Sequence, residues 1–334
     1  MPQTYSQGYA LIIGVGADLP VTVDDAQAIS GMLLDPSRCA YPRNHVRLLV
    51  SENARRDGIV SSLEWLAESV GANDTAIVYF SGHGIETPDF HLVPYGFDWD
   101  DLDGTAVAGA EFTRLLRSIK SGKLLVLLDC CHAGGQAEAK VEAQSKYFVQ
   151  TPLPPGALEE LGRSGGRVVI ASSRKDEVSW TGRPYSQFTM ALLEALAGYG
   201  AFEQDGFARI LDLAMYVGRR VPERTNDKQH PIIKVNNLED NFAVAYYAAG
   251  DGKPKALSWS AADATTAVPN ADDRQVQAWR RMLANHRESL LLIEQRMSEY
   301  VLSTDVPLQL LREKRQSEEK INQLEGRLGG GHHA

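Results

Sequence analysis

The amino-acid sequence predicts an α/β fold, in which a mostly parallel β-sheet flanked by helices is followed by a C-terminal helical hairpin. Short apolar runs alternate with helix-like periods over residues 1–250, the pattern of strands joined by crossover helices. Residues 251–272 are rich in Ala, Ser, Thr and Pro, a composition typical of a linker. Over 273–328 apolar residues recur at steps of three and four, which predicts a helical hairpin or coiled-coil module.

The strands predicted for the first domain are short apolar runs bounded by small or polar residues, as expected of strands buried on both faces. They are Tyr9–Gly14, Val46–Ser51, Thr75–Phe80, Leu124–Asp129 and Arg167–Ser172. Either Pro231–Val235 or Phe242–Tyr247 adds a sixth strand. The predicted helices are Asp25–Leu34, Ile59–Val70, Ala110–Ser118, Ser186–Ala197 and Phe207–Arg220. The connection 90–109 is acidic and turn-rich.

The C-terminal segment carries a heptad-like seam. Its first arm contains Val276, Trp279, Leu283, His286, Leu290, Ile293, Met297 and Tyr300. Residues 303–307 then predict a helix break and restart, with Pro307 near the first helical position. A sparser seam follows at Leu310, Ile321, Leu324 and Leu328. We expect an antiparallel hairpin, which either packs back on the first domain or, as we favour, recruits a regulatory protein partner.

Composition excludes several classes of function. The chain has 334 residues, 43% of them hydrophobic, and a net charge of −9, which disfavours binding to nucleic acid or to an anionic membrane. Three cysteines, two of them adjacent, do not make a disulfide framework. The N-terminus is polar, and no apolar stretch approaches the ~20 residues of a membrane span. We therefore expect a cytoplasmic protein.

Two polar segments follow neighbouring predicted strands, Ser81–Gly84 after one and Asp129–Gly134 after the other. In parallel sheets functional groups collect beyond the carboxyl ends of the strands, so His83 and Cys131 are expected on the same rim. A histidine can take the thiol proton of a cysteine, and the thiolate is a nucleophile. The alternative is a buried, inert cysteine. We assign that role to the adjacent Cys130, which should point into the core on the opposite face of the strand.

The spacing of the two residues sharpens this prediction, because His83 lies 48 residues upstream of Cys131 and caspases place their histidine about 50 residues upstream of the cysteine. From about Tyr9 to Tyr247 the chain resembles the caspase-like peptidases, within them the metacaspase and prokaryotic caspase branch. The segments that carry the resemblance are Tyr9–Val15, Asp24–Ala26, Ser81–Gly84 and Asp129–Gly134. The resemblance implies a caspase-hemoglobinase-like fold with Cys131 as nucleophile and His83 as general base and acid.

The resemblance also implies the groups around the reacting bond. The glycines beside His83 predict a tight turn, and the backbone N–H groups of Gly84 and Cys131 are the expected oxyanion donors. In metacaspases the residues that match Asp25 and Asp129 line the S1 pocket, which takes the side chain before the cleaved bond. At an effective dielectric near 20, one charge contact at ~4 Å is worth about 4 kcal/mol before desolvation. Two carboxylates therefore favour Arg or Lys.

Simpler roles exist for both carboxylates: Asp25 compensating charge at a helix N-terminus, and Asp129 anchoring a loop. True caspases carry Gln-Ala where this chain has Asp129-Cys130, which argues against aspartate specificity. The sequence thus predicts a cysteine endopeptidase that cleaves after Arg or Lys through an acyl-enzyme. The alternatives are a non-catalytic caspase-fold adaptor that assembles partners through its C-terminal helices, and an Asp-specific peptidase.

No metal or other cofactor is expected. The acidic loop is formed by Asp98, Asp100, Asp101 and Asp103. It misses the spacing of an EF-hand, so a solvated loop is the better interpretation.

Control of the activity is expected in the stretch 136–166. A loop of that length inside a compact domain is usually functional or disordered. It directly follows the predicted nucleophile and offers Lys140, Lys146 and Arg163 as candidate self-cleavage sites for an enzyme with basic specificity. The alternative is that these are ordinary surface charges.

Overall fold

The computed structural model describes residues 3–86, 89–130, 166–174, 177, 179–236, 238, 240–257, 314–315, 318 and 320–321. The chain divides into two compact units, Met1–Ser258 and Trp259–Ala334. Because most of the second unit lies outside the described residues, the limits of the domain, linker and hairpin stay a prediction. Among the described residues, no helix is long and apolar enough to cross a membrane.

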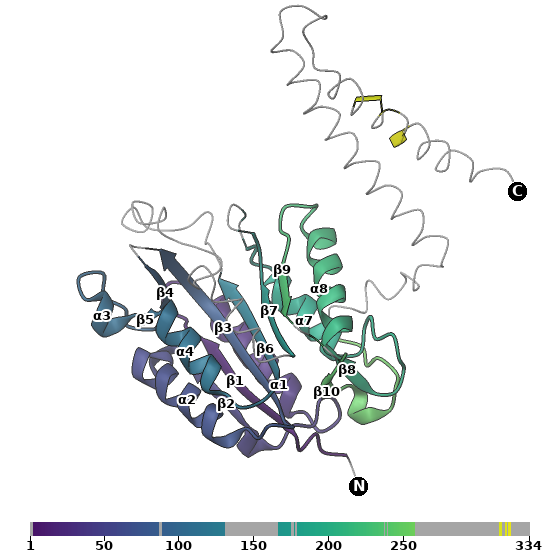
Figure 1. Ribbon diagram of the computed structural model, residues 1–334, viewed down its shortest axis with the longest axis horizontal. Helices are drawn as coiled ribbons and strands as arrows, with labels where there is room; N and C mark the ends of the chain where they lie inside the picture. Colours follow the sequence, from purple (N-terminus) through teal and green to yellow (C-terminus); the bar gives the residue numbers. More distant parts are fainter. Residues whose placement is uncertain are drawn as a thin grey trace, which may run out of the picture. The chain divides into compact units, whose positions relative to one another are not determined.

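The first unit is built on a mostly parallel sheet, which confirms the predicted α/β fold (Figure 1). Its strands are β1 (Gly8–Gly14), β2 (Val46–Val50), β3 (Thr75–Glu86), β6 (Lys123–Cys130), β7 (Arg167–Ala171) and β9 (Ile232–Asn236). They are ordered β2-β1-β3-β6-β7-β9. The neighbours pair in parallel up to β7, and β9 pairs with β7 antiparallel. Of the two candidates for a sixth strand, Pro231–Val235 is therefore the one that joins this sheet.

Helices cover both faces of the sheet (Figure 1). They are α1 (Val21–Leu34), α2 (Arg56–Ser69), α4 (Gly109–Ser118), α7 (Gln187–Leu196) and α8 (Ile210–Arg224). Short 3₁₀ helices are η1 (Arg43–His45), η2 (Ser51–Ala54) and η5 (Ala248–Gly250). On one face, α2 and α4 enclose a hydrophobic core with β1, β3 and β6. On the other face lie α1 and α7, with α8 packed against α7.

Side-chain alternation along β6 explains why its sequence is continuously apolar. Leu124, Val126, Leu128 and Cys130 lie in the core beneath α2 and α4. The intervening Leu125 and Leu127 are buried as well, because the sheet is covered on both sides. On this second face, Tyr79 of β3 shares a 2.8 Å hydrogen bond with Thr189 of α7.

Two local predictions are corrected by the structure. Strand β3 does not end at Phe80 but continues to Glu86, where it pairs antiparallel with β4 (Phe90–Val93). Thus the acidic connection holds β4, α3 (Leu102–Thr105) and β5 (Val107–Ala108), which pairs with β4. This hairpin satisfies backbone groups beyond the main sheet, and nothing in its short apolar runs distinguishes it from a loop.

The second correction concerns the predicted helix Phe207–Arg220. Its first residues form β8 (Phe207–Arg209), and the helix begins at Ile210. Strand β8 pairs antiparallel with β10 (Ala243–Tyr246) in a separate small sheet. A partner distant in sequence thus overrides the local helical period.

In the second unit, residues 314, 315, 318, 320 and 321 are helical. Lys314 and Glu318 form an i,i+4 ion pair at 3.8 Å. The remainder of the predicted hairpin lies outside the described residues.

Candidate active site

The candidate site lies at the rim where β1, β3 and β6 leave the main sheet. In the strand register Ser81 lies opposite both Gly14 of β1 and Asp129 of β6. Helix α1 packs tightly on this end of β1. A Cβ at Gly14 would lie 2.3 Å from the Thr22 carbonyl oxygen, so glycine is needed there. This close approach brings Asp25 of α1 to the same rim.

His83 lies within β3 rather than in the tight turn that its flanking glycines predict, since it pairs with Val93 of β4. Its side chain is 7% exposed, and its Nε2 lies 2.9 Å from Oδ2 of Asp18. Burial acts to raise the pKa of the Asp18 carboxyl. The hydrogen bond from His83 and its charge outweigh burial, so the pKa of Asp18 lies below its ordinary value. The predicted general base therefore has a carboxylate partner that the sequence analysis did not identify.

A constrained turn between β1 and α1 holds Asp18. Gly16 and Ala17 have φ values of +74° and +56°, and left-handed backbone costs an L-residue such as alanine about 1–2 kcal/mol. The Gly16 N–H donates to the Thr22 hydroxyl at 2.8 Å. That hydroxyl donates to the Leu19 carbonyl at 2.8 Å. Thr22 thus closes the turn around Asp18 from the first turn of α1.

The structure brings the predicted pocket residues Asp25 and Asp129 together, both fully buried. Ser186, the N-cap of α7, connects them. Its N–H donates to Oδ1 of Asp25 at 2.9 Å, and its hydroxyl donates to Oδ2 of Asp129 at 2.6 Å. The Ser179 hydroxyl donates to the other Asp129 oxygen at 3.0 Å. The N-terminus of α7, which favours negative charge, therefore faces both carboxylates.

The two carboxylates differ in how well they are satisfied. Asp25 accepts the Ser186 N–H on one oxygen, while its buried Oδ2 has no hydrogen-bond partner among the described residues. Burial first, and then the charge of Asp129, raise the pKa of Asp25 to about 8, against the lowering effect of Ser186. Buried, closely spaced carboxyls cannot both ionise without compensation. The pair therefore favours uptake of a proton or of a cation.

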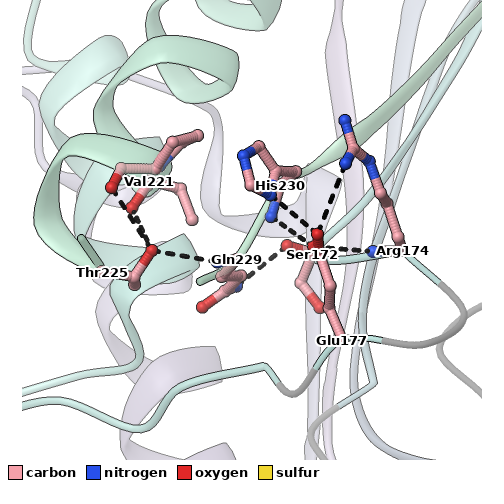
Figure 2. Close-up of polar contacts among 8 residues, drawn as sticks. Ser172, Arg174, Glu177, Val221, Thr225, Gln229 and His230 are labelled. Carbon is pink, nitrogen blue, oxygen red and sulfur yellow. Dashed lines mark hydrogen bonds and ion pairs between the residues drawn. The ribbon is translucent and has the colours of Figure 1, made fainter. Parts of the chain in front are cut away.

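The buried Gln229, which Figure 2 shows beside Ser172, also contacts the loop that contains Ser179. Its Nε2 donates to the Ser172 carbonyl at 2.9 Å and lies 3.3 Å from the Ser179 hydroxyl. Its Oε1 accepts the N–H of Trp180 at 2.8 Å.

On the same loop, Glu177 accepts from both the ring and the backbone N–H of His230, at 2.7 and 2.6 Å. Figure 2 shows Glu177 between His230 and Arg174, whose guanidinium lies 3.6 Å away. These contacts fasten the loop that follows β7 to the start of β9.

Cys130 occupies the place that strand alternation predicts. It is buried in the core, and burial first, then the charge of Asp129, raise the pKa of its thiol well above the ordinary value. It is therefore a poor nucleophile. Gly84, a predicted oxyanion donor, lies in β3 opposite Leu92 of β4. The predicted nucleophile Cys131 lies outside the described residues.

The acidic loop uses its carboxylates to hold its own backbone. Oδ1 of Asp98 accepts the N–H of Asp100 at 3.0 Å, and Oδ1 of Asp101 accepts the N–H of Gly104 at 3.1 Å. In the part of the chain that the structure describes, no group of three or more His, Cys, Asp or Glu side chains is placed to hold a metal ion.

Several residues at this rim escaped the sequence analysis. They are Asp18, Ser179, Ser186, Gln229 and Thr189, whose hydroxyl lies 3.5 Å from Oδ2 of Asp129. Asp18 follows the carboxyl end of the first strand, so the rule that located His83 could have found it. Ser186 is the first residue of the predicted helix Ser186–Ala197, and a serine at a helix start is a typical N-cap. For Ser179 and Gln229 the sequence carries no comparable signal.

The fold is thus an α/β sheet that carries a histidine on β3 and an acid on β6 at one rim, with a second acid on the adjacent helix α1. The family model for the caspase domain matches residues 7–243. The chain therefore belongs to the caspase domain family of cysteine-type peptidases, peptidase family C14.

Curated relatives are similar at low identity. Metacaspase-1 of Scheffersomyces stipitis is 23% identical over 301 residues, which cover 84% of this chain and 67% of that protein. Metacaspase-2 of Arabidopsis thaliana is 24% identical over 225 residues, 57% of this chain and 53% of that protein. Metacaspase-1 of Eremothecium gossypii is 25% identical over 165 residues, 43% of this chain and 35% of that protein. The matched part of this chain thus spans about a third to two thirds of these relatives.

Among solved structures, a protein from Geobacter sulfurreducens superimposes with a TM-score of 0.46 at 16% identity. The match covers 70% of this chain and 94% of that chain.

Proposed function

We propose that this protein is a cysteine endopeptidase that cleaves after Arg or Lys, with Cys131 as nucleophile and His83 as general base and acid. The observation that carries the proposal is the buried pair Asp25 and Asp129, set at the same rim as His83. One oxygen of Asp25 has no partner within the described residues, so the guanidinium or ammonium group of a substrate supplies what the pair lacks.

The reaction follows from these groups. His83 removes the thiol proton of Cys131, and the sulfur attacks the substrate carbonyl. The N–H groups of Gly84 and Cys131 stabilise the negative oxygen of the tetrahedral intermediate. His83 then protonates the leaving amine, and water, activated by the same histidine, hydrolyses the acyl-enzyme. The pairing of β3 with β6 ends at Gly82 and Cys130, one residue before His83 and Cys131, which supports their partnership.

A pair of electrophilic peptides tests this function. A peptidyl ketone with Arg before the reactive group should label Cys131, while the matched Asp ketone should label it far more slowly. Cys131→Ala should abolish labelling and peptidase activity, and Cys130→Ala should retain most of both. Faster labelling by the Asp ketone would contradict basic specificity. No labelling by either ketone would favour the adaptor that assembles partners through its C-terminal helices.

Self-processing is part of the proposal. Lys140, Lys146 and Arg163 lie outside the described residues, so the support is their basic character and their position after the nucleophile. Mass spectrometry of purified wild type and Cys131→Ala decides this point. Fragments that end at one of these residues in the wild type alone would support self-cleavage. An intact, fully active wild type would contradict it.

The proposal also covers the role of the C-terminal helices and the cellular compartment of the protein. We expect residues 273–328 to recruit a regulatory partner and the protein to work in the cytoplasm. Cleavage in the linker 251–272 should leave a folded, thiol-reactive first domain. Loss of its cooperative unfolding would show instead that the helices belong to the same core.

A further inference from the structure

His83 contacts the carboxylate of Asp18, which lies in the turn between β1 and α1. Oδ2 of Asp18 lies 2.9 Å from Nε2 of His83, and the histidine ring is almost fully buried while Asp18 is 49% exposed. An ionised carboxylate can only accept a hydrogen bond, so in this contact Nε2 carries the proton. In the neutral ring Nδ1 is then the nitrogen with a lone pair, and it is the one that can take a thiol proton.

The turn that contains Asp18 has a strained backbone, which hydrogen bonds from neighbouring segments stabilise. Two successive left-handed residues, Gly16 and Ala17, precede it, and strained backbone of this kind persists where the surroundings enforce it. Thr22 bonds both sides of the turn. The N–H of Val15 donates to the carbonyl of Ser81 at 3.0 Å. The last bond ties the turn to β3, two residues before His83.

We propose that Asp18 is a positioning residue, which holds the ring of His83 in the tautomer and orientation that turn Nδ1 toward the nucleophile. The proposal rests on the proposed role of His83 as the base. The negative charge of Asp18 also stabilises the imidazolium that forms when His83 takes the proton. Because half of Asp18 is in water, its charge is screened, and we assign the larger part of its effect to the hydrogen bond.

A purely structural Asp18, needed only to close its turn, predicts a different result. Its loss would lower the folded fraction and leave the turnover of the folded molecules unchanged. A positioning role predicts a loss of kcat in folded protein with little change in KM, because the substrate's basic side chain binds at Asp25 and Asp129. It also predicts that asparagine, which keeps an acceptor oxygen of similar shape, restores part of what alanine loses.

The experiment compares full-length wild type, Asp18→Ala and Asp18→Asn on a fluorogenic peptide with Arg before the cleaved bond. Asp18→Ala should lower kcat by about ten- to a hundredfold with KM within about twofold, and Asp18→Asn should fall between it and the wild type. Glu52→Gln is the matched control. Glu52 is an exposed acid of η2, which adjoins the Gly16 turn through Ser51, so it removes the same charge close to the rim.

A second readout separates this proposal from the proposed function. Iodoacetamide is uncharged and small, so its reaction with Cys131, located by mass spectrometry, reports on the thiol and its base without using the S1 pocket. Asp18→Ala should slow it several-fold, and His83→Ala should slow it as well. If wild type fails to cleave Arg peptides yet shows this pattern, basic specificity is wrong and the role of Asp18 stands.

Three results would overturn the role of Asp18. One is a kcat and an alkylation rate of Asp18→Ala both within about twofold of wild type. Another is an equal loss in Glu52→Gln. The third is a loss in Asp18→Asn as large as in Asp18→Ala, with a matching loss of folded protein in circular dichroism, which would make the residue structural.

Discussion

Two buried carboxylates on neighbouring helices, Glu194 of α7 and Asp25 of α1, differ in how many donors and cations surround them. Glu194 accepts from Arg224 at 2.5 Å and from the hydroxyl of Tyr216 at 2.9 Å, and Arg220 lies 3.5 Å away. Burial, and then the charge of Glu194, raise the pKa of Tyr216, so the hydroxyl stays a donor. Asp25 receives the N–H of Ser186, and no described residue forms an ion pair with it.

The comparison separates a buried charge that the protein itself compensates from one that can still take up a proton or a ligand. A buried charge is tolerated when cations and donors compensate it, and around Glu194 the chain supplies them from α8, the helix packed beside it. Around Asp25 no described residue supplies such a cation, and a proton or a ligand can compensate the charge. Under the proposed function, that ligand is the basic side chain of the substrate.

The largest expected effect is on the free energy of unfolding, through the ion pairs of Glu194. Arg224→Leu leaves the buried Glu194 with less compensation and should destabilise the protein by about 3 kcal/mol. Urea unfolding followed by circular dichroism measures the change. Arg219→Leu is the control, since Arg219 is 41% exposed in a surface pair with Glu223 and should cost less than about 1 kcal/mol. Equal losses of stability in both variants would contradict the idea that Arg224 compensates the buried charge of Glu194.

For Asp25, the substitution Asp25→Asn should lower kcat/KM for an Arg peptide by about a hundredfold, because a hydrogen bond to a charged group is worth about 1.5–3 kcal/mol. The loss should be much smaller on a peptide with a neutral residue at that position. Asp24→Asn, an exposed acid one residue earlier on the same helix, is the matched control. An equal loss on both peptides would show that Asp25 supports the fold rather than the pocket.

The same substitution should stabilise the free protein. The pKa of Asp25, raised to about 8, exceeds that of the unfolded chain, so the folded state binds more protons between about pH 4 and pH 8. Stability from this group therefore falls as pH rises through that window. Asp25→Asn lacks the titration and should be more stable by about 1–2 kcal/mol at pH 7, since its amide still buries polar atoms. The gain should shrink steadily as pH falls from 7 toward 4, as urea midpoints across pH will show.

The smallest expected effect is proton-linked binding. With a pKa of about 8 for Asp25, the ionised fraction rises between pH 7 and pH 8, so an Arg-terminated peptide should bind about fivefold more tightly at the higher pH. Calorimetry with Cys131→Ala isolates binding from the chemistry, and buffers of different ionisation enthalpy report the proton released. Binding that is independent of pH, with no proton release, would show that the pair is already ionised in the free protein.

The fold and half of the site were predictable because they depend on local signals. Short buried strands identified the sheet, and the position of Ser81–Gly84 and Asp129–Gly134 after two of them predicted that His83 and Cys131 lie at the same rim. In the structure Asp129 of β6 pairs there with Ser81 of β3. The same local logic failed at β3, which continues past Phe80, and at Phe207–Arg209, which form a strand. In both places a pairing partner distant in sequence, β4 or β10, decides the conformation.

By itself the sequence determined the class of fold, the family and the residue types available for the chemistry, because apolar period and motif spacing are properties of the chain. Only the tertiary structure decided which acids face each other and what compensates them. Asp25 and Glu194 are both acids in helical periods. The packing of α1, α7 and α8 gives one of them two arginines and the other an unpartnered oxygen. Likewise, Asp18 becomes the neighbour of His83 only when β1 and β3 pair, since hydrogen bonds and desolvation depend on distances in space rather than along the chain.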